Sequence, residues 1–376
     1  MEIQGSLFQY ITLFLLIAAL TVQLIFWLRF YFSASSSSLA EPGQSSQPVS
    51  VIICARNEAA NLSQYLPAVL EQDYPGFEVI VVNDCSDDDS DMVLSELKSR
   101  YSHLKISTIH KDPRFHHNKK LAQLIGIKAA ANEILLFTDA DCRPESDQWL
   151  RMMTAHLIGD RDFVLGYGGY QEGKGILNKY VRYDTMFIAM QYLGMAMKGR
   201  PYMGVGRNLA YRKSLFMNRN NFSSHYHIAS GDDDLFVNAN ATAVNTAVET
   251  GSGSRTWSVP ANSFSALMKQ KKRHMTTAAM YKMRDRVLLF AEPFSRLIFY
   301  SAAVVLLVQL YLWPVITAVL MARFVVMSVV LNKAAKRLGE KGLTMPALFF
   351  DILAPFINSL FYLSSFGRGA GSKAWR

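Results

Sequence analysis

Cysteine is scarce in this chain of 376 residues. Cys54, Cys85 and Cys142 are its three cysteines, and they lack the paired spacing of a zinc site. The shortage excludes a disulfide framework and agrees with a reducing compartment. We therefore expect small buried cysteines without a catalytic role.

Charged residues are also few, at 18 % of the chain, and no segment combines clustered basic residues with the aromatic residues of a nucleic-acid-binding module. The sequence therefore argues against nucleic acid as a partner. The net charge of +9 suits a protein resting on anionic membrane lipids, and general solubility explains the same charge equally well.

A long uncharged apolar run stands near the start of the chain. Residues 7–28 are long enough to cross a bilayer, and Arg29 follows them. A secretory signal peptide would have a basic start and a shorter apolar core. We expect residues 1–32 to be a transmembrane anchor with its N-terminus outside. The alternative is a signal peptide cleaved at Ser33-Ala34-Ser35.

A second apolar region lies at the other end of the chain. After a Ser-rich linker at 33–48 and a mostly polar region at 49–293, residues 294–376 contain two or three apolar segments. Pro314 divides the first long run, and Thr344–Phe366 is a further candidate. We favour three spans, because the basic loop after the first two belongs in the cytoplasm with the polar region. That loop contains Lys333, Lys336, Arg337 and Lys341.

The polar region alternates apolar, β-rich segments with helical ones. This alternation predicts an α/β fold with a mostly parallel sheet covered by helices, in which ligands bind outside the carboxyl ends of the strands. The predicted strands are Val49–Ala55, Phe77–Val82, Lys105–Ile109 and Ile134–Phe137.

Asp139 and Asp141 follow the last of these strands. Side chains at i and i+2 lie on the same side of an extended backbone, so the two carboxylates can bind one hard cation together. Arg56, Asn57 and Asp84 follow other predicted strands and should meet the pair at the same sheet edge.

Turn and cap chemistry is the alternative explanation for several of these residues. Asn57 and Glu58 can cap a helix, and Asp88 and Asp89 more readily fit a turn before the next helix. Lys119 can be the solvated start of a helix.

Several motifs resemble those of membrane-anchored family 2 glycosyltransferases with the GT-A (Rossmann-like) fold, over roughly residues 48–275. The resemblance implies that Arg56, Asn57 and Glu58 border the nucleotide, and that Asp84 holds its base or ribose. The segment that starts at Lys119 resembles a family helix. The motif residues are Val49–Glu58, Val82–Asp88, Lys119–Ile127 and Thr138–Asp141.

Ser230-Gly231-Asp232-Asp233-Asp234-Leu235 resembles the family's Gly-Glu-Asp-x-x-Leu motif. In that register Asp233 is the catalytic base and Asp232 stands in place of Glu. Inverting transfer requires a carboxylate that takes the proton of the acceptor hydroxyl. The alternative is that these aspartates decorate the start of a helix, which we favour for Asp234.

Gln270 and Arg273 match the family's Gln-x-x-Arg-Trp motif, with His274 in place of Trp. The resemblance implies that Arg273 meets the donor diphosphate and Gln270 lines the acceptor side, while His274 argues against a polysaccharide channel. The alternative is a basic amphipathic segment on lipid headgroups. By the same resemblance, Asn208 borders the donor sugar and acceptor.

The resemblance implies an inverting transferase that uses Mg²⁺ or Mn²⁺ and a nucleotide diphosphate sugar, with a UDP-sugar expected. The acceptor would be lipid-linked or a saccharide, at a bacterial inner membrane with the catalytic domain in the cytoplasm. A processive polysaccharide synthase is a weaker version of this hypothesis. A metal-dependent nucleotidyltransferase and a non-catalytic membrane subunit are the alternatives from other classes.

Overall fold

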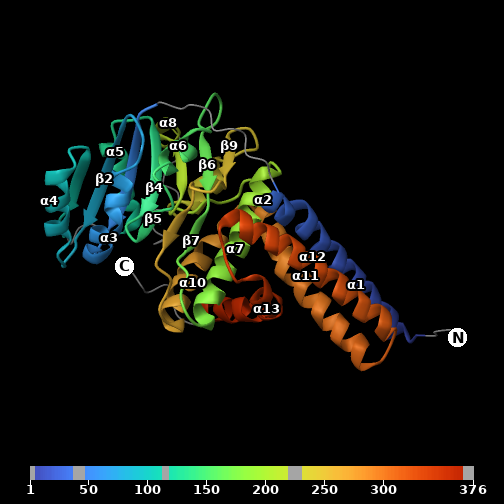
Figure 1. Cartoon of the computed structure of the whole chain (residues 1–376). Helices are drawn as coiled ribbons and strands as arrows, with labels where there is room; N and C mark the ends of the chain where they lie inside the picture. Colours follow the sequence, from blue (N-terminus) through green and yellow to red (C-terminus); the bar gives the residue numbers. More distant parts are fainter. Residues whose placement is uncertain (1–4, 37–46, 112–117, 219–230, 367–376) are drawn as a thin grey trace.

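The computed structural model describes residues 5–36, 47–111, 118–218 and 231–366. An α/β domain occupies one end of the molecule, and a bundle of long helices extends away from it (Figure 1). Within the described residues, a seven-stranded sheet has the order β3-β2-β1-β4-β8-β6-β9.

The predicted parallel sheet is confirmed. Strand β1 pairs in parallel with both β2 and β4, and β2 pairs in parallel with β3. The strands are β1 (Val49–Ala55), β2 (Phe77–Asp84), β3 (Leu104–Ile109) and β4 (Ile134–Asp139). The antiparallel β8 then separates β4 from the parallel pair of β6 and β9. These strands are β6 (Phe163–Gly166), β8 (Leu209–Arg212) and β9 (Thr246–Glu249).

Helices cover both faces of this sheet because its central strands are apolar on both sides. Ile53 of β1 packs in one hydrophobic cluster with α3 (Ala59–Leu70), α4 (Ser90–Arg100) and α6 (Trp149–Thr154). Its neighbour Ile52 faces the other cluster, with α5 (Lys119–Ala129). Opposite orientation of neighbouring residues is what an extended strand imposes.

A small second sheet stands beside the main one. Strand β10 pairs antiparallel with β5 and parallel with β7. The strands are β5 (Cys142–Pro144), β7 (Gly168–Tyr170) and β10 (Thr256–Ser258). Because β5 directly follows the Asp139–Asp141 turn, this sheet fixes one side of that turn. Short helices α8 (Lys213–Asn218) and α9 (Asp234–Asn240) and the longer α10 (Phe264–Ala278) complete the domain.

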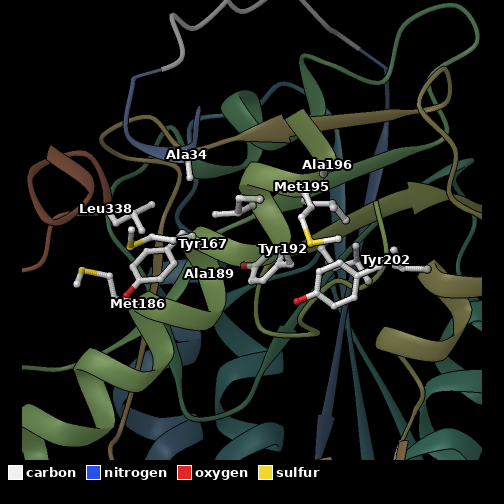
Figure 2. Packing of buried hydrophobic residues seen from close by; sticks show 14 of the residues in the cluster. Ala34, Tyr167, Met186, Ala189, Tyr192, Met195, Ala196, Tyr202 and Leu338 are labelled. Atoms are coloured by element: carbon white, nitrogen blue, oxygen red, sulfur yellow. The ribbon is translucent and has the colours of Figure 1, made fainter. Parts of the chain in front are cut away.

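Helix α7 (Ile176–Met197) was not predicted from the sequence. It lies between the domain and the helical bundle, and residues on all its sides are buried. Figure 2 shows side chains of α7 packed with Tyr167 and Tyr202 of the domain, Ala34 and Leu338. At Gly194 an added Cβ would stand 2.1 Å from the carbonyl oxygen of Phe30, so glycine allows this close contact.

Three helices in the described residues are long and apolar enough to cross a membrane. The predicted anchor is continuous from α1 (Leu7–Ile25) through a π-helical segment (Phe26–Tyr31) to α2 (Phe32–Ser36). The first residues of the predicted linker are therefore helical, with Ala34 buried. Residues 37–46 of that linker lie outside the described residues.

The other two candidate spans are α11 (Met283–Val308) and α12 (Trp313–Leu338). The turn between them precedes Pro314, which lies in the first turn of α12, where its missing N–H is tolerated. Helix α11 starts eleven residues before the predicted start of the membrane region at residue 294. Two of the predicted loop lysines, Lys333 and Lys336, belong to α12.

Helix α13 (Thr344–Phe366) has the same bounds as the third C-terminal span that we favoured. Its segment Thr344–Leu360 is apolar, and the helix continues to Phe366. Figure 1 shows α13 close to α7 and α10, and it also packs against α11 and α12. The described residues thus contain two C-terminal candidate spans, α11 and α12, and a third span at α13 stays a prediction.

A buried polar cluster joins these helices. Asp351 of α13 accepts hydrogen bonds from Arg296 of α11 (3.1 Å) and Arg323 of α12 (2.7 Å). Arg323 also donates to Gln23 of α1 (2.9 Å), and Arg296 pairs with Glu292. Ionised groups inside apolar helices persist when they are paired in this way.

Candidate active site

The carboxyl ends of β1, β2 and β4 meet at one edge of the main sheet, as the parallel pairing requires. Asp139 is the last residue of β4, and Lys119 is the first residue of α5. Asn118 accepts a hydrogen bond from the backbone N–H of Leu121 and so caps that helix. The cap places Lys119 at the sheet edge, where its Nζ donates to Asp139 Oδ1 at 2.8 Å.

Lys119 also joins this edge to the aspartates before α9. Its Nζ lies 3.5 Å from Asp232 Oδ2 and 3.9 Å from Asp233 Oδ2. Segments about 90 residues apart in sequence therefore share one ammonium group. The structure thus brings Asp139, Asp232 and Asp233 together, which is the arrangement that the motifs predicted.

Two residues that the sequence analysis did not select complete the surroundings of Asp233. Gln123, one helical turn after Lys119, donates through Nε2 to Asp233 Oδ1 at 3.4 Å. A Cβ at Gly206 would stand 2.0 Å from Asp233 Oδ2, so this glycine leaves room for the carboxylate. The i, i+4 spacing of Lys119 and Gln123 on one helix face was the signal that could have revealed Gln123.

Electrostatics distinguish the carboxylates. Burial and the nearby Asp232 raise the pKa of Asp233 to about 8, and Lys119 opposes the rise. Burial also disfavours ionisation of Asp139, but Lys119, with Arg207 and Arg273, outweighs it and holds the pKa of Asp139 below its ordinary value. The site therefore contains one carboxyl group with a pKa near neutral pH, Asp233, and one that stays ionised, Asp139.

Asp139, Asp141 and Cys142 offer ligand atoms that lie within 4.8 Å of one another. Ser258 of β10 donates to Asp141 Oδ2 at 2.7 Å and fixes that carboxylate. Burial and the ionised Asp139 raise the pKa of Asp141, a repulsion that a bound cation would relieve. Burial also raises the pKa of the Cys142 thiol, so carboxylate oxygens are the better donors and a hard cation such as Mg²⁺ or Mn²⁺ fits them.

The predicted nucleotide-side residues lie where β1 and β2 end. Asp84 is buried at the end of β2, and Arg56 is half-buried after β1. The Asn57 side chain accepts from the backbone N–H of Asp87 at 2.8 Å and links the two loops. Glu58 accepts from Asn61 at 2.5 Å. Burial raises the pKa of Glu58 despite the Asn61 bond, and Asp141 and Asp139 add to the effect, which places Glu58 on the metal side of the edge.

Asp88 belongs to a turn, as the alternative explanation predicted, and Asp234 links two helices. Asp88 accepts from the backbone N–H groups of Ala59 (2.9 Å) and Ser90 (3.1 Å). Asp234 accepts from Thr277 at 2.5 Å and Tyr281 at 2.7 Å, which ties α9 to the end of α10.

Helix α10 contributes the predicted Gln270 and Arg273. Gln270 Nε2 donates to the hydroxyl of Tyr170 at 2.5 Å. Arg273 lies close enough to Asp139 to help lower the pKa of that carboxyl group. The Nε of Arg273 is buried without a hydrogen-bond partner in the described structure. Arg273 therefore keeps one N–H group that no described protein group accepts.

Asn208 corrects our prediction. Its Oδ1 accepts from Trp149 (3.0 Å), and its Nδ2 donates to the carbonyl oxygens of Tyr167 (2.9 Å) and Ser254 (2.8 Å). The side chain is fully buried and its hydrogen-bonding capacity is used by the protein interior. Asn208 therefore supports the fold behind the site, and the preceding Arg207 is the residue that lies beside Asp139 and Asp141.

Comparison with known proteins agrees with this geometry. The model of the glycosyl transferase family 2 domain matches residues 50–219. This segment, which is less than half of the chain, therefore resembles a glycosyl transferase family 2 domain. The match contains Asp84, Lys119 and the Asp139–Asp141 pair, whereas Asp233 and Arg273 lie beyond it.

Curated relatives match this domain in part. Glycosyltransferase AglE of Haloferax volcanii is 34% identical over 113 residues, 30% of this chain and 36% of that protein. Probable glycosyltransferase YdaM of Bacillus subtilis is 27% identical over 173 residues, 44% of this chain and 41% of that protein. The chain thus spans about two fifths of the length of the relatives it matches.

One solved structure resembles nearly the whole chain. The mannosyltransferase PcManGT from Pyrobaculum calidifontis, in complex with GDP-Man and Mn²⁺, has a TM-score of 0.63 and 18% sequence identity. The superposition covers 96% of this chain and 99% of that one. The two chains therefore share a fold.

Proposed function

We propose that this protein is an inverting glycosyltransferase that moves a sugar from a nucleotide diphosphate sugar to an acceptor hydroxyl at a membrane. The observation that carries the proposal is the contact of Lys119 with Asp139, Asp232 and Asp233. This contact supports the proposal, because a candidate metal ligand, Asp139, and a candidate base, Asp233, lie within 3.9 Å of one ammonium group. The expected donor is a UDP-sugar, and GDP-sugars are tested beside it.

Each residue has a defined role in this proposal. Asp233 takes the proton of the acceptor hydroxyl as its oxygen attacks the anomeric carbon. Asp84 holds the nucleotide, and Arg273 donates to the leaving diphosphate. A divalent cation held by Asp139 and Asp141 would neutralise charge on that leaving group. Lys119 keeps Asp139 ionised and Asp232 in place.

The proposed location is the bacterial inner membrane, with α1, α11 and α12 spanning it and the α/β domain in the cytoplasm. The positive-inside rule supports this orientation, because Arg29, Lys333 and Lys336 lie at the domain end of the helices. Helix α13 exposes a stripe of apolar side chains and suits the membrane surface. The stripe consists of Met345, Phe349, Ile352, Phe356 and Leu360.

The proposed acceptor is lipid-linked or a saccharide. The packing of α10, which contains Gln270 and Arg273, against α13 supports a site near the membrane surface. The predicted domain limits become a membrane anchor to Ser36, a catalytic domain at 49–282 and a membrane region from Met283.

Asp141→Ala is expected to remove the metal-dependent part of donor binding, since one of the two cation ligands is lost. Isothermal titration calorimetry of the purified protein with UDP-sugar and GDP-sugar donors, with Mg²⁺ or with EDTA, measures this. Wild-type affinity should fall in EDTA, and the variant should bind equally weakly in both. Asp160→Ala, at an exposed site, is the control. Equal affinities of wild type and Asp141→Ala with Mg²⁺ would refute the metal assignment.

The pKa of Asp233 predicts a pH profile. Because the base must be ionised and the pKa of Asp233 in the free protein is about 8, kcat/KM should rise with pH and level off above about 8. Asp232→Asn removes a neighbouring negative charge that raises this pKa, so the rising limb should move to lower pH. An unchanged limb would mean that another group titrates.

A further inference from the structure

Arg207 is a half-buried cation without a carboxylate partner. In the described part of the chain, no Asp or Glu oxygen lies within ion-pair distance of its guanidinium, and its Nη1 is buried without a hydrogen-bond partner. An unpaired buried charge is costly, so such a group persists where a ligand supplies the opposite charge. Nothing in the motifs that predicted the site assigns it a role.

The surroundings hold this guanidinium in one place. Its central carbon lies 4.3 Å from the centroid of the Tyr170 ring, and Gln270 donates to the Tyr170 hydroxyl. The carbonyl oxygen of Arg207 accepts from Thr138 (3.1 Å) and Thr256 (2.9 Å), which fix its backbone between β4 and β10. Stacking on an aromatic ring leaves the planar N–H groups of arginine free to donate along the ring edge.

Strand β7 lies close to Arg207. A Cβ at Gly168 would stand 2.9 Å from the Cβ of Arg207, so β7 and the Arg207 loop touch through a glycine. Tyr170, at the end of β7, is thereby brought under the guanidinium. The arginine, its aromatic support and Gln270 form a built cationic subsite.

The position of the subsite identifies the anion. Arg207 lies beside Asp139 and Asp141 and interacts with both electrostatically. It does not form an ion pair with either of them, so its donors remain available while the carboxylates bind a cation. An anion that reaches the cation through its own oxygens also reaches Arg207. In a nucleotide diphosphate sugar, the phosphate that carries the sugar has this property.

We propose that Arg207 binds the β-phosphate of the donor, opposite Arg273. This role rests on the proposed function. In the transfer, the bond between the anomeric carbon and the β-phosphate oxygen breaks and its electron pair stays on that oxygen. The acceptor oxygen forms the new bond, and its proton passes to Asp233. Arg207 and Arg273 then share the negative charge that develops on the leaving oxygen.

Calorimetry with nucleotides tests this role, because a diphosphate and a monophosphate differ by the β-phosphate alone. UDP and UMP, and GDP and GMP, are titrated with Mg²⁺ into full-length wild type, Arg207→Gln, Arg207→Lys and Tyr170→Leu. Arg207→Gln should weaken diphosphate binding roughly ten- to hundredfold, the range for a charge-assisted hydrogen bond, and leave monophosphate binding within about twofold. Arg207→Lys and Tyr170→Leu should lie between, because each loses the fixed planar donor geometry.

Arg100→Gln is the matched control, since that exposed arginine on α4 loses the same charge far from the site. A thermal melt of each variant confirms that it folds. Equal losses for the diphosphate and the monophosphate, or unchanged diphosphate affinity in Arg207→Gln, would overturn the role of Arg207. A wild-type protein that binds neither diphosphate would instead overturn the proposed function.

Discussion

Asp233→Asn is expected to reduce turnover by roughly 10²–10⁴-fold while donor binding persists, because a general base contributes about that much and the amide cannot accept the proton. Asp233 is the carboxyl group whose pKa is raised to about 8, and Lys119 and Gln123 hold it beside the metal-binding pair. Turnover of the purified variant is measured with the donor that wild type hydrolyses or transfers, and donor affinity is measured by calorimetry.

Asp160→Asn serves as the control for the same chemical change at an exposed position. A variant that keeps near wild-type turnover would show that Asp233 is not the base. Loss of donor binding together with turnover would assign Asp233 to substrate binding instead.

Asp351→Asn is expected to destabilise the folded protein by about 3–5 kcal/mol, the usual cost of removing one partner from a buried ion cluster. The substitution removes the carboxylate that accepts from Arg296, Arg323 and Tyr300. Arg323 is then left buried among α1, α11 and α12 without its counter-charge. Denaturant unfolding of the protein in detergent measures the change.

The double variant Asp351→Leu/Arg323→Met is the informative control. It removes both charges and leaves Arg296 paired with Glu292, so it should cost less than Asp351→Asn alone. A single variant that loses less than about 1 kcal/mol, or a double variant that loses more than the single, would show that the buried polar cluster does not stabilise the fold in this way.

The first four strands could be predicted almost to the residue, because strands buried on both faces form short continuous apolar runs. Strand β1 (Val49–Ala55) agrees at both ends, and β2 and β4 extend two residues beyond the prediction. The extensions include Asp84 and Asp139, polar residues that continue the strand hydrogen bonding although their side chains belong to the site. The apolar pattern alone could not place them inside a strand.

Helix α7 and the limits of the membrane helices could not be predicted in the same way. Residues on all sides of α7 are buried, so no apolar stripe marks it. Helix α11 begins among charged residues such as Asp285, which pairs with Asn238 of α9 at 3.0 Å, so composition misplaced its start. Helix α13 is apolar enough to suggest a span, and its ties to α7, α10 and the buried cluster emerge in three dimensions.

In the site, motif register selected Lys119, Asp139, Asp141, Asp232 and Asp233, which the fold brings together. Motif register selected Asn208, whereas the neighbouring Arg207 is the residue beside the aspartates. The resemblance marked the segment before β8, but which neighbouring side chain faces the site depends on how that strand enters the sheet. Trp149 and the backbone of Ser254 form hydrogen bonds with Asn208, and the Tyr170 ring stacks on Arg207. None of these partners is near in sequence.

The central claim is that Asp233, together with a divalent cation held by Asp139 and Asp141, promotes cleavage of the bond between sugar and diphosphate. The most direct test is ³¹P NMR of the purified full-length protein incubated with UDP- and GDP-sugars and Mg²⁺. The account predicts release of the nucleoside diphosphate from one class of donor, suppressed by EDTA and by Asp141→Ala. Release of pyrophosphate, or of a nucleoside monophosphate with a sugar phosphate, would mean attack at phosphorus and would contradict it.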